Sequence, residues 1–152
     1  MFSRMPLSAR LVVVTVAILS FTALTVSLSA ASPQAPMKKA FHATKDCSGS
    51  TGLVGSFCTI RSSNVKAIKV GSKIFYFEAA GKLALDSDVV LYVERGTTAA
   101  GHCRLVYATG LGLCTFSDGT GKLTGFQARV RVSLDSKVPK LYHWDGTYSF
   151  KR

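Results

Sequence analysis

Short apolar runs with a period of two residues dominate the chain from residue 52 onward. Such alternation is typical of β-strands with one buried face. No apolar stripe with a period of 3.6 residues persists for three turns there, so a substantial helix is not expected. The pattern predicts an all-β domain. The clearest example has Phe126, Ala128, Val130 and Val132 on one face, against Gln127, Arg129 and Arg131 on the other.

Eight such runs are separated by glycine-bearing or polar breaks. Thr109-Gly110 and Asp118-Gly119 supply residues that tolerate positive φ, as tight hairpins require. Eight antiparallel strands either close into a barrel or stack as a sandwich, and closure removes edges that favour aggregation. The expected strands are Leu53–Ile60, Val65–Val70, Lys73–Ala79, Val89–Glu94, His102–Tyr107, Leu113–Phe116, Phe126–Ser133 and Leu141–Phe150.

The N-terminal segment has the pattern of a secretory signal peptide. Arg4 and Arg10 precede an apolar stretch at 11–28, and small residues follow at Ser29-Ala30-Ala31. Cleavage after Ala31 is expected to yield a secreted protein without a stable membrane span. A retained anchor is the alternative, because the apolar stretch reaches the lower limit for crossing a bilayer.

Residues 32–46 contain Pro33, Pro36 and little periodic hydrophobicity, which predicts a flexible leader. The domain is expected to span 47–152. Without Arg4 and Arg10 the chain carries 17 basic and 8 acidic residues, a net charge of about +9 that favours contact with anionic surfaces. The lysines are spread along the chain, so a solvated surface is the alternative, and no specific nucleic-acid site is expected.

All four cysteines follow the expected cleavage site. An even count in an exported chain normally means disulfide bonds, and four cysteines allow three pairings. Ten residues separate Cys47 from Cys58, and ten separate Cys103 from Cys114. These matched intervals favour two local bonds, whereas zinc sites prefer cysteines two to four residues apart.

The segment 101–150 resembles the second half of the allene oxide cyclase and dirigent barrels. In that superfamily a Gly-Gly-Ser/Thr-Gly turn leads into a strand that begins near another glycine. Here Asp118 replaces the first glycine of the turn. The residues that carry the resemblance are Gly101-His102-Cys103, Cys114-Thr115-Phe116, Asp118-Gly119-Thr120-Gly121-Lys122, Thr124-Gly125-Phe126 and Tyr142 to Phe150.

The resemblance implies an eight-stranded antiparallel barrel, often trimeric, with a hydrophobic lumen that binds a small organic molecule. Plant allene oxide cyclases fold a reactive epoxide for ring closure and dirigent proteins orient radicals, in both cases without a cofactor. The catalytic residues of the plant cyclases are not carried over, because the N-terminal half does not match. The shared turn, Asp118, Gly119, Thr120 and Gly121, is expected to be structural, with positive φ at Gly119 or Gly121.

Glu78 and Glu94 are the candidate catalytic residues, because each ends an apolar run where a barrel mouth is expected. A carboxyl in an apolar pocket has a raised pKa and can act as a general acid or base. Alternation puts Tyr76 with Glu78 and Tyr92 with Glu94 on a common face. The alternative is that both carboxylates point outward and pair with Lys or Arg.

No metal site is expected, because His42, His102 and His143 lie far apart in the sequence with few acidic neighbours. The leading hypothesis is an exported barrel that binds a small hydrophobic ligand in its lumen. A cofactor-independent isomerase or cyclase with the same lumen is one alternative, and a basic protein that binds the cell envelope is another. Whether the protein is an enzyme is left open.

Overall fold

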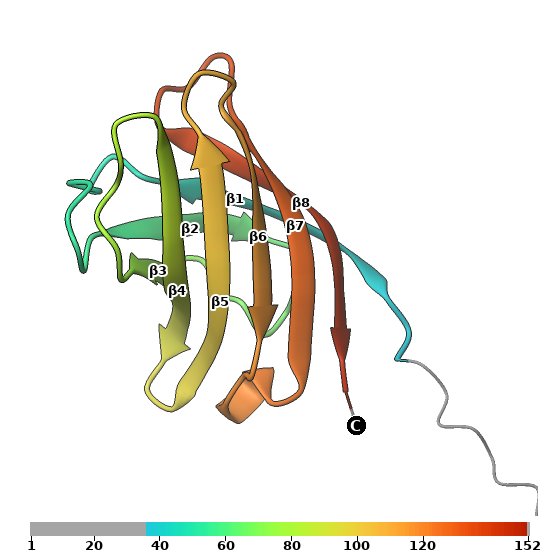
Figure 1. Cartoon of the computed structure of the whole chain (residues 1–152). Coiled ribbons are helices and arrows are strands. Elements are labelled where there is room, and N and C mark those ends of the chain that lie inside the picture. Colours follow the sequence, from blue (N-terminus) through green and yellow to red (C-terminus); the bar gives the residue numbers. More distant parts are fainter. Residues whose placement is uncertain (1–35, 152) are drawn as a thin grey trace, which may run out of the picture. The chain divides into compact units, whose positions relative to one another are not determined.

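Eight antiparallel strands form a closed barrel in the computed structural model, which describes residues 36–151 (Figure 1). Each strand pairs with its neighbours in the sequence, and β8 pairs with β1, so the sheet has no unpaired edge. The expected all-β, eight-stranded barrel is therefore confirmed. The strands are β1 (Lys39–Asp46), β2 (Phe57–Ser63), β3 (Lys73–Tyr76), β4 (Ala84–Glu94), β5 (Thr97–Val106), β6 (Leu111–Ser117), β7 (Phe126–Leu134) and β8 (Leu141–Phe150).

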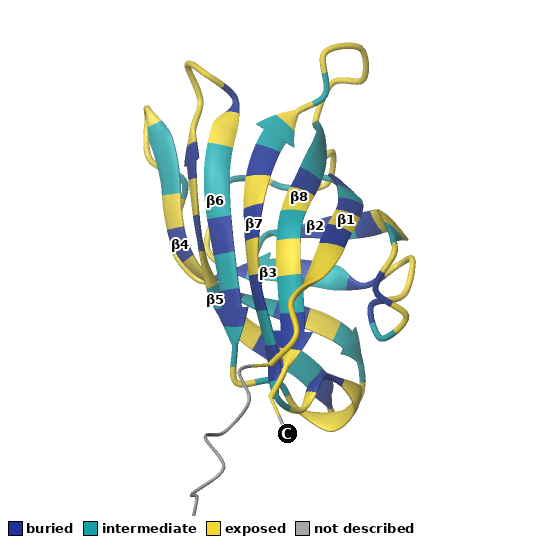
Figure 2. Ribbon diagram, turned by 90° about the vertical axis from the view of Figure 1, so that its right-hand side faces the viewer, coloured by how far each residue is buried: buried dark blue, intermediate teal, exposed yellow. Residues whose placement is uncertain are grey.

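Alternating burial follows the sequence pattern along the strands, as the bands of buried and exposed residues in Figure 2 show. In β7, the apolar residues at even positions from Phe126 to Val132 are buried and their neighbours are more exposed. The described residues contain no helix long and apolar enough to cross a membrane. The expected signal peptide, 1–31, lies outside the described residues.

The first strand is where the structure departs most from the sequence prediction. β1 occupies Lys39–Asp46, within the segment 32–46 expected to be a flexible leader, so the barrel begins before residue 47. Conversely, Val65–Val70 is not a strand but part of the connection between β2 and β3. Val65 and Ile68 are nevertheless buried, which explains why this connection has the composition of a strand.

One end of the barrel is closed by side chains from two connections. Leu123 in the short 3-10 helix η1 (Gly121–Leu123) is fully buried, and Val65 and Ile68 are buried in the β2–β3 connection. At the end of β4, the Glu94 carboxylate accepts hydrogen bonds from Lys69 Nζ at 2.6 Å and Lys122 Nζ at 2.7 Å. Glu94 thereby links the two segments that cover this end.

Aromatic side chains fill the barrel interior next to the closed end. The Phe41 ring makes edge-on contacts with Phe126 and Trp144, with 6.2 Å between ring centroids in each pair. Phe116 packs on Trp144 at 5.2 Å. All four side chains are almost completely buried. The barrel interior is therefore a packed core over most of its length rather than an open channel.

The turn after β6 takes the conformation that its residues predict. Gly121 has a φ of +55°, which confirms the expected positive φ in this turn, and Asp118 has a φ of +52°. Asp is among the residues that tolerate this left-handed region, so it can replace glycine there. Gly119 is constrained differently: an added Cβ would overlap the backbone carbonyl of Leu123.

Two disulfide bonds join neighbouring strands. Cys47 follows β1 and is bonded to Cys58 in β2, and Cys103 in β5 is bonded to Cys114, its direct partner in β6. These are the two local pairs that the spacings favour. Each bond closes a short loop, which stabilises the fold by about 2–3 kcal/mol through the lowered entropy of the unfolded chain.

Candidate functional site

A pocket of about 280 Å³ lies at the end of the barrel opposite η1. The odd-numbered strands end there and the even-numbered strands begin there. Because antiparallel strands bring these termini together, residues distant in sequence meet around one opening. The polar and sulfur-bearing side chains of the lining include Lys45, Cys58, Tyr76, Glu78, Arg104, Tyr107, Lys140 and Tyr142, and the apolar ones include Leu85, Leu105 and Val132.

Lys45 is the most unusual residue of this pocket. Strand alternation turns Phe41, Ala43 and Lys45 to the interior, so the ammonium-bearing side chain continues an apolar face and is only 4% exposed. Its Nζ donates a hydrogen bond to Tyr76 Oη at 2.7 Å. The same nitrogen lies 5.0 Å from the ring centroid of Trp144 and 5.6 Å from that of Tyr142.

The electrostatic balance disfavours charge on Lys45. Burial lowers its pKa from the ordinary 10.5 to about 7, because an ammonium loses its hydration inside the barrel. Aromatic faces attract a cation, but no carboxylate of the described residues pairs with Lys45. A carboxylate beside Lys45 would offset the desolvation of its ammonium group far better than the aromatic rings do. The amine is therefore available in its neutral, nucleophilic form near neutral pH.

Tyr76 provides a hydroxyl group beside this amine. Burial raises its pKa above the ordinary value of 10, so the phenol keeps its proton. Tyr76 Oη also lies 3.5 Å from Cys58 Sγ. Burial likewise raises the pKa of Tyr107 and Tyr142, with smaller contributions from neighbouring tyrosines. The pocket thus holds an amine that is about half neutral at pH 7, together with protonated phenols and the apolar side chains of Leu85, Leu105 and Val132.

The structure does not bring together the four residues that the sequence suggested as catalytic candidates, Tyr76, Glu78, Tyr92 and Glu94. Tyr76 and Glu78 both line the pocket, but Glu78 is exposed, and its Oε2 accepts the backbone N–H of Asp88 at 2.6 Å. The Glu94 carboxylate lies at the closed end, where hydrogen bonds from Lys122 and Lys69 lower its pKa to about 2. That position matches the expected alternative of an outward carboxylate paired with lysine.

The Tyr92 side chain lies outside the barrel. It is 40% exposed and packs against Phe75, which itself contacts Phe57, so these rings form a row on the outer face of β2, β3 and β4. The expected common face for Tyr76, Tyr92 and both glutamates is therefore wrong, because Tyr76 points inward and Tyr92 outward.

Lys45 was not among the sequence candidates. Its signal is the alternation Phe41-x-Ala43-x-Lys45 immediately before Cys47, which continues an inward face to a basic residue. The interpretation of this segment as a leader concealed that signal.

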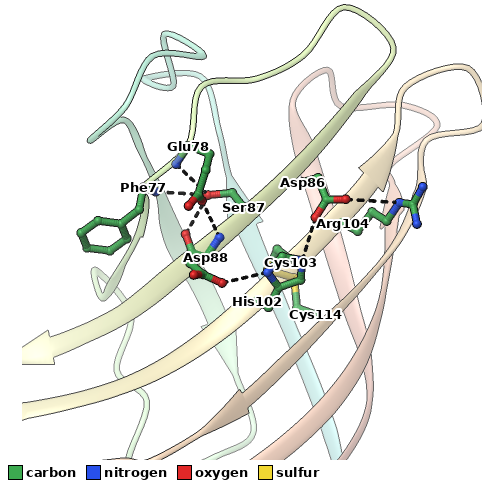
Figure 3. Close-up of polar contacts among 9 residues, drawn as sticks. All are labelled: Phe77, Glu78, Asp86, Ser87, Asp88, His102, Cys103, Arg104 and Cys114. Carbon is green, nitrogen blue, oxygen red and sulfur yellow. Dashed lines mark hydrogen bonds and ion pairs between the residues drawn. A yellow bond between two sulfur atoms is a disulfide. The ribbon is translucent and has the colours of Figure 1, made fainter.

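A second polar cluster lies on the barrel exterior and has a different character (Figure 3). His102 in β5 lies between two carboxylates of β4, with its Nε2 2.7 Å from Asp86 and its Nδ1 2.9 Å from Asp88. Asp88 and Asp86 raise the pKa of His102. These side chains are about half exposed or more, and no group of described residues is arranged to hold a metal ion.

No protein-family model, curated protein or solved structure matches the chain.

Proposed function

We propose that this protein binds a small organic molecule in the pocket formed by Lys45, Tyr76 and Tyr142. The observation that carries the proposal is a buried amine at the wall of a cavity with no carboxylate partner among the described residues. Buried polar groups are usually fully hydrogen-bonded, because an unmade bond costs about 1–3 kcal/mol. A ligand with a hydrogen-bonding group would satisfy this amine.

The pocket chemistry defines the class of ligand. Lys45 and Tyr76 offer N–H and O–H donors, whereas Leu85, Leu105 and Val132 offer apolar contact. A volume of about 280 Å³ is slightly below the range typical of drug-sized ligands. A compact apolar molecule with one carbonyl or carboxylate group fits both properties.

The proposal also includes the finer assignments expected from the sequence. A closed barrel of eight antiparallel strands and the left-handed turn at Asp118 support membership of the allene oxide cyclase and dirigent superfamily. Two disulfide bonds support export to an oxidising compartment. A homotrimer belongs to the same proposal, and native mass spectrometry would give its mass together with that of any retained ligand.

Binding can be measured directly through Trp144, the only tryptophan of the chain. Its ring lies 5.0 Å from Lys45 Nζ, so a ligand that contacts the amine should change its fluorescence. We expect saturable changes with benzyl alcohol and with benzoate. For benzoate, Lys45→Met should weaken affinity about tenfold, the effect of one lost hydrogen bond. The exposed Lys66→Met is the matched control.

Absence of any saturable change with both probes, together with no retained ligand, would contradict the proposal. The alternative of a basic envelope-binding protein gives a different result. Binding of an anionic polymer would weaken steeply with salt and would be unchanged in Lys45→Met, because Lys45 is buried.

A further inference from the structure

We propose that Lys45 is a nucleophilic amine that forms a reversible imine with an aldehyde or ketone held in the pocket. The inference rests on the proposed ligand-binding function and specifies the chemical class of the ligand. It extends that function from binding to covalent capture.

The geometry isolates one amine within reach of a bound carbonyl group. Lys45 lines the pocket, and its Nζ makes a single hydrogen bond, to Tyr76 Oη, among the described residues. The ring centroids of Tyr142, Trp144 and Tyr76 lie 5.0–5.6 Å from Nζ. No second hydrogen-bond partner among the described residues occupies the nitrogen, so it can reach a carbonyl carbon in the pocket.

The charged and titratable groups around the pocket come from several elements. They are Tyr76 and Glu78 at the end of β3, Arg104 and Tyr107 at the end of β5, Lys140 before β8, and Tyr142 in β8. Glu78 accepts a backbone hydrogen bond from Asp88. Arg104 and Lys140 are basic residues, so they do not favour a positive charge on Lys45.

The protonation state of Lys45 supports the same chemistry. Burial lowers its pKa to about 7, so about half of the molecules carry the free amine at neutral pH. An exposed lysine with the ordinary pKa of 10.5 has about one free amine in 3,000 at pH 7. Lys45 therefore has the form that attacks carbonyl groups, as other desolvated lysines do.

The reaction is redox-neutral and needs no cofactor. The lone pair of Lys45 Nζ forms a bond to the carbonyl carbon, and the carbonyl oxygen takes up a proton to give a carbinolamine. The C–O bond then breaks, and the oxygen leaves as water with the two protons that the amine loses. A C=N bond remains between Lys45 and the ligand.

Tyr76 acts as a positioning residue for the amine and is placed to donate to the carbonyl oxygen. Its raised pKa keeps the phenol protonated. Because its Oη lies 2.7 Å from Lys45 Nζ, an oxygen on the carbon that Nζ attacks would be within its reach.

The test uses benzaldehyde and sodium cyanoborohydride, whose hydride converts an imine into a stable secondary amine. We expect one benzyl group per chain at pH 7, mapped to Lys45 by peptide mass spectrometry. Lys45 should react about a hundredfold faster than any single exposed lysine, because its free-amine fraction is over a thousandfold higher while its lower basicity makes each free amine less nucleophilic. The ratio of Lys45 labelling to exposed-lysine labelling should fall as pH rises from about 7 to 10, because only the exposed lysines gain much free amine over that range.

Three variants separate chemistry from folding. Lys45→Met has no amine at this position and should not be labelled there, whereas Lys66→Met should be labelled at Lys45 like the wild type. Tyr76→Phe should slow labelling about tenfold at benzaldehyde concentrations that saturate the Trp144 signal. Labelling is then compared between filled pockets, so a slower rate reports the chemical step and neither weaker binding nor misfolding.

Benzyl alcohol distinguishes failure of this inference from failure of the proposed function. Saturable binding of benzyl alcohol and of benzaldehyde, with no benzyl group on Lys45 after reduction, would overturn imine formation and leave ligand binding in place. Labelling spread evenly over exposed lysines would overturn it as well. Absence of both binding and labelling would overturn both proposals.

Discussion

Replacing Lys45 with methionine tests the charge state of the buried amine through stability. Methionine has a similar length and no ionisable group, so it can occupy the same space in the barrel interior. We expect the free energy of unfolding of the wild-type protein to rise with pH between about 7 and 10, relative to that of Lys45→Met.

The sign follows from proton binding in the two states. Above pH 7 the folded protein loses the Lys45 proton, whereas the unfolded chain keeps it up to the ordinary pKa of 10.5. The unfolded state then binds more protons, so stability increases with pH by at most about 1.4 kcal/mol per pH unit. Between pH 7 and pH 10 the total is about 3–4 kcal/mol. Below pH 7 both states are protonated and this group contributes no slope.

Other groups titrate in or near this range but cancel in the comparison. The raised pKa of His102 stabilises the folded state at low pH, and that stabilisation is lost as the pH rises through the pKa of His102 in the folded protein. The raised pKa values of Tyr76, Tyr107 and Tyr142 destabilise the folded state only above about pH 10, where the unfolded tyrosines ionise. Both proteins share these groups, so the difference between their pH profiles reports Lys45.

Urea unfolding followed by Trp144 fluorescence at pH 7, 8 and 9 measures the effect. All four cysteines are in disulfide bonds, so no thiolate can start disulfide exchange at the higher pH. The exposed Lys82→Met serves as control and should retain the wild-type slope. Parallel profiles for wild type and Lys45→Met would refute the reasoning, because they would show that Lys45 stays charged among the aromatic rings.

Three further predictions concern the rest of the molecule. Gly121→Val should lower Tm by several degrees in calorimetry, because a β-branched residue at φ +55° is strained by about 1 kcal/mol or more and its Cβ would overlap the Gly96 carbonyl. Lys122→Ala should change Tm little, since its ion pair with Glu94 is exposed. An equal loss of Tm in both variants would contradict a structural turn. Peptide mapping without reduction should recover Cys47 linked to Cys58 and Cys103 linked to Cys114, and a Cys58–Cys103 peptide would show that the pairing is wrong. N-terminal sequencing of the secreted protein should begin at Ser32, whereas Met1 in membrane fractions would indicate a retained anchor.

Strand periodicity made most of this barrel predictable. The glycine-bearing breaks at Thr109-Gly110 and Asp118-Gly119 separated β5, β6 and β7, and the break from Ser136 to Pro139 separated β7 from β8. β1 was missed because its inward positions are Phe41, Ala43 and Lys45, and a lysine ends the apolar pattern that identifies a buried strand. The β2–β3 connection was mistaken for a strand because Val65 and Ile68 are buried for another reason, covering the closed end.

The candidate site was predictable in part. A tyrosine and a carboxylate at the end of an apolar strand were expected at a barrel mouth, and Tyr76, the last residue of β3, and Glu78 do line the pocket. The position of Glu94 could not be deduced, because Lys69 and Lys122 come from connections whose paths the sequence does not specify. The alternation at Phe41, Ala43 and Lys45 indicates an inward lysine, but its aromatic neighbours Tyr142 and Trp144 depend on the pairing of β1 with β8, segments at opposite ends of the barrel sequence.

The pairing of β1 with β8 determines when the Lys45 site forms during folding. Lys45 is the direct partner of Tyr142 in this ladder, and Trp144 belongs to the same strand. The entropy of closing so long a segment makes this the contact least favoured early in folding. Until the last strand joins, the Lys45 amine is in water and remains an unreactive ammonium ion. Reactivity toward carbonyl compounds would therefore appear only with barrel closure, so incomplete chains and early folding intermediates would not carry it.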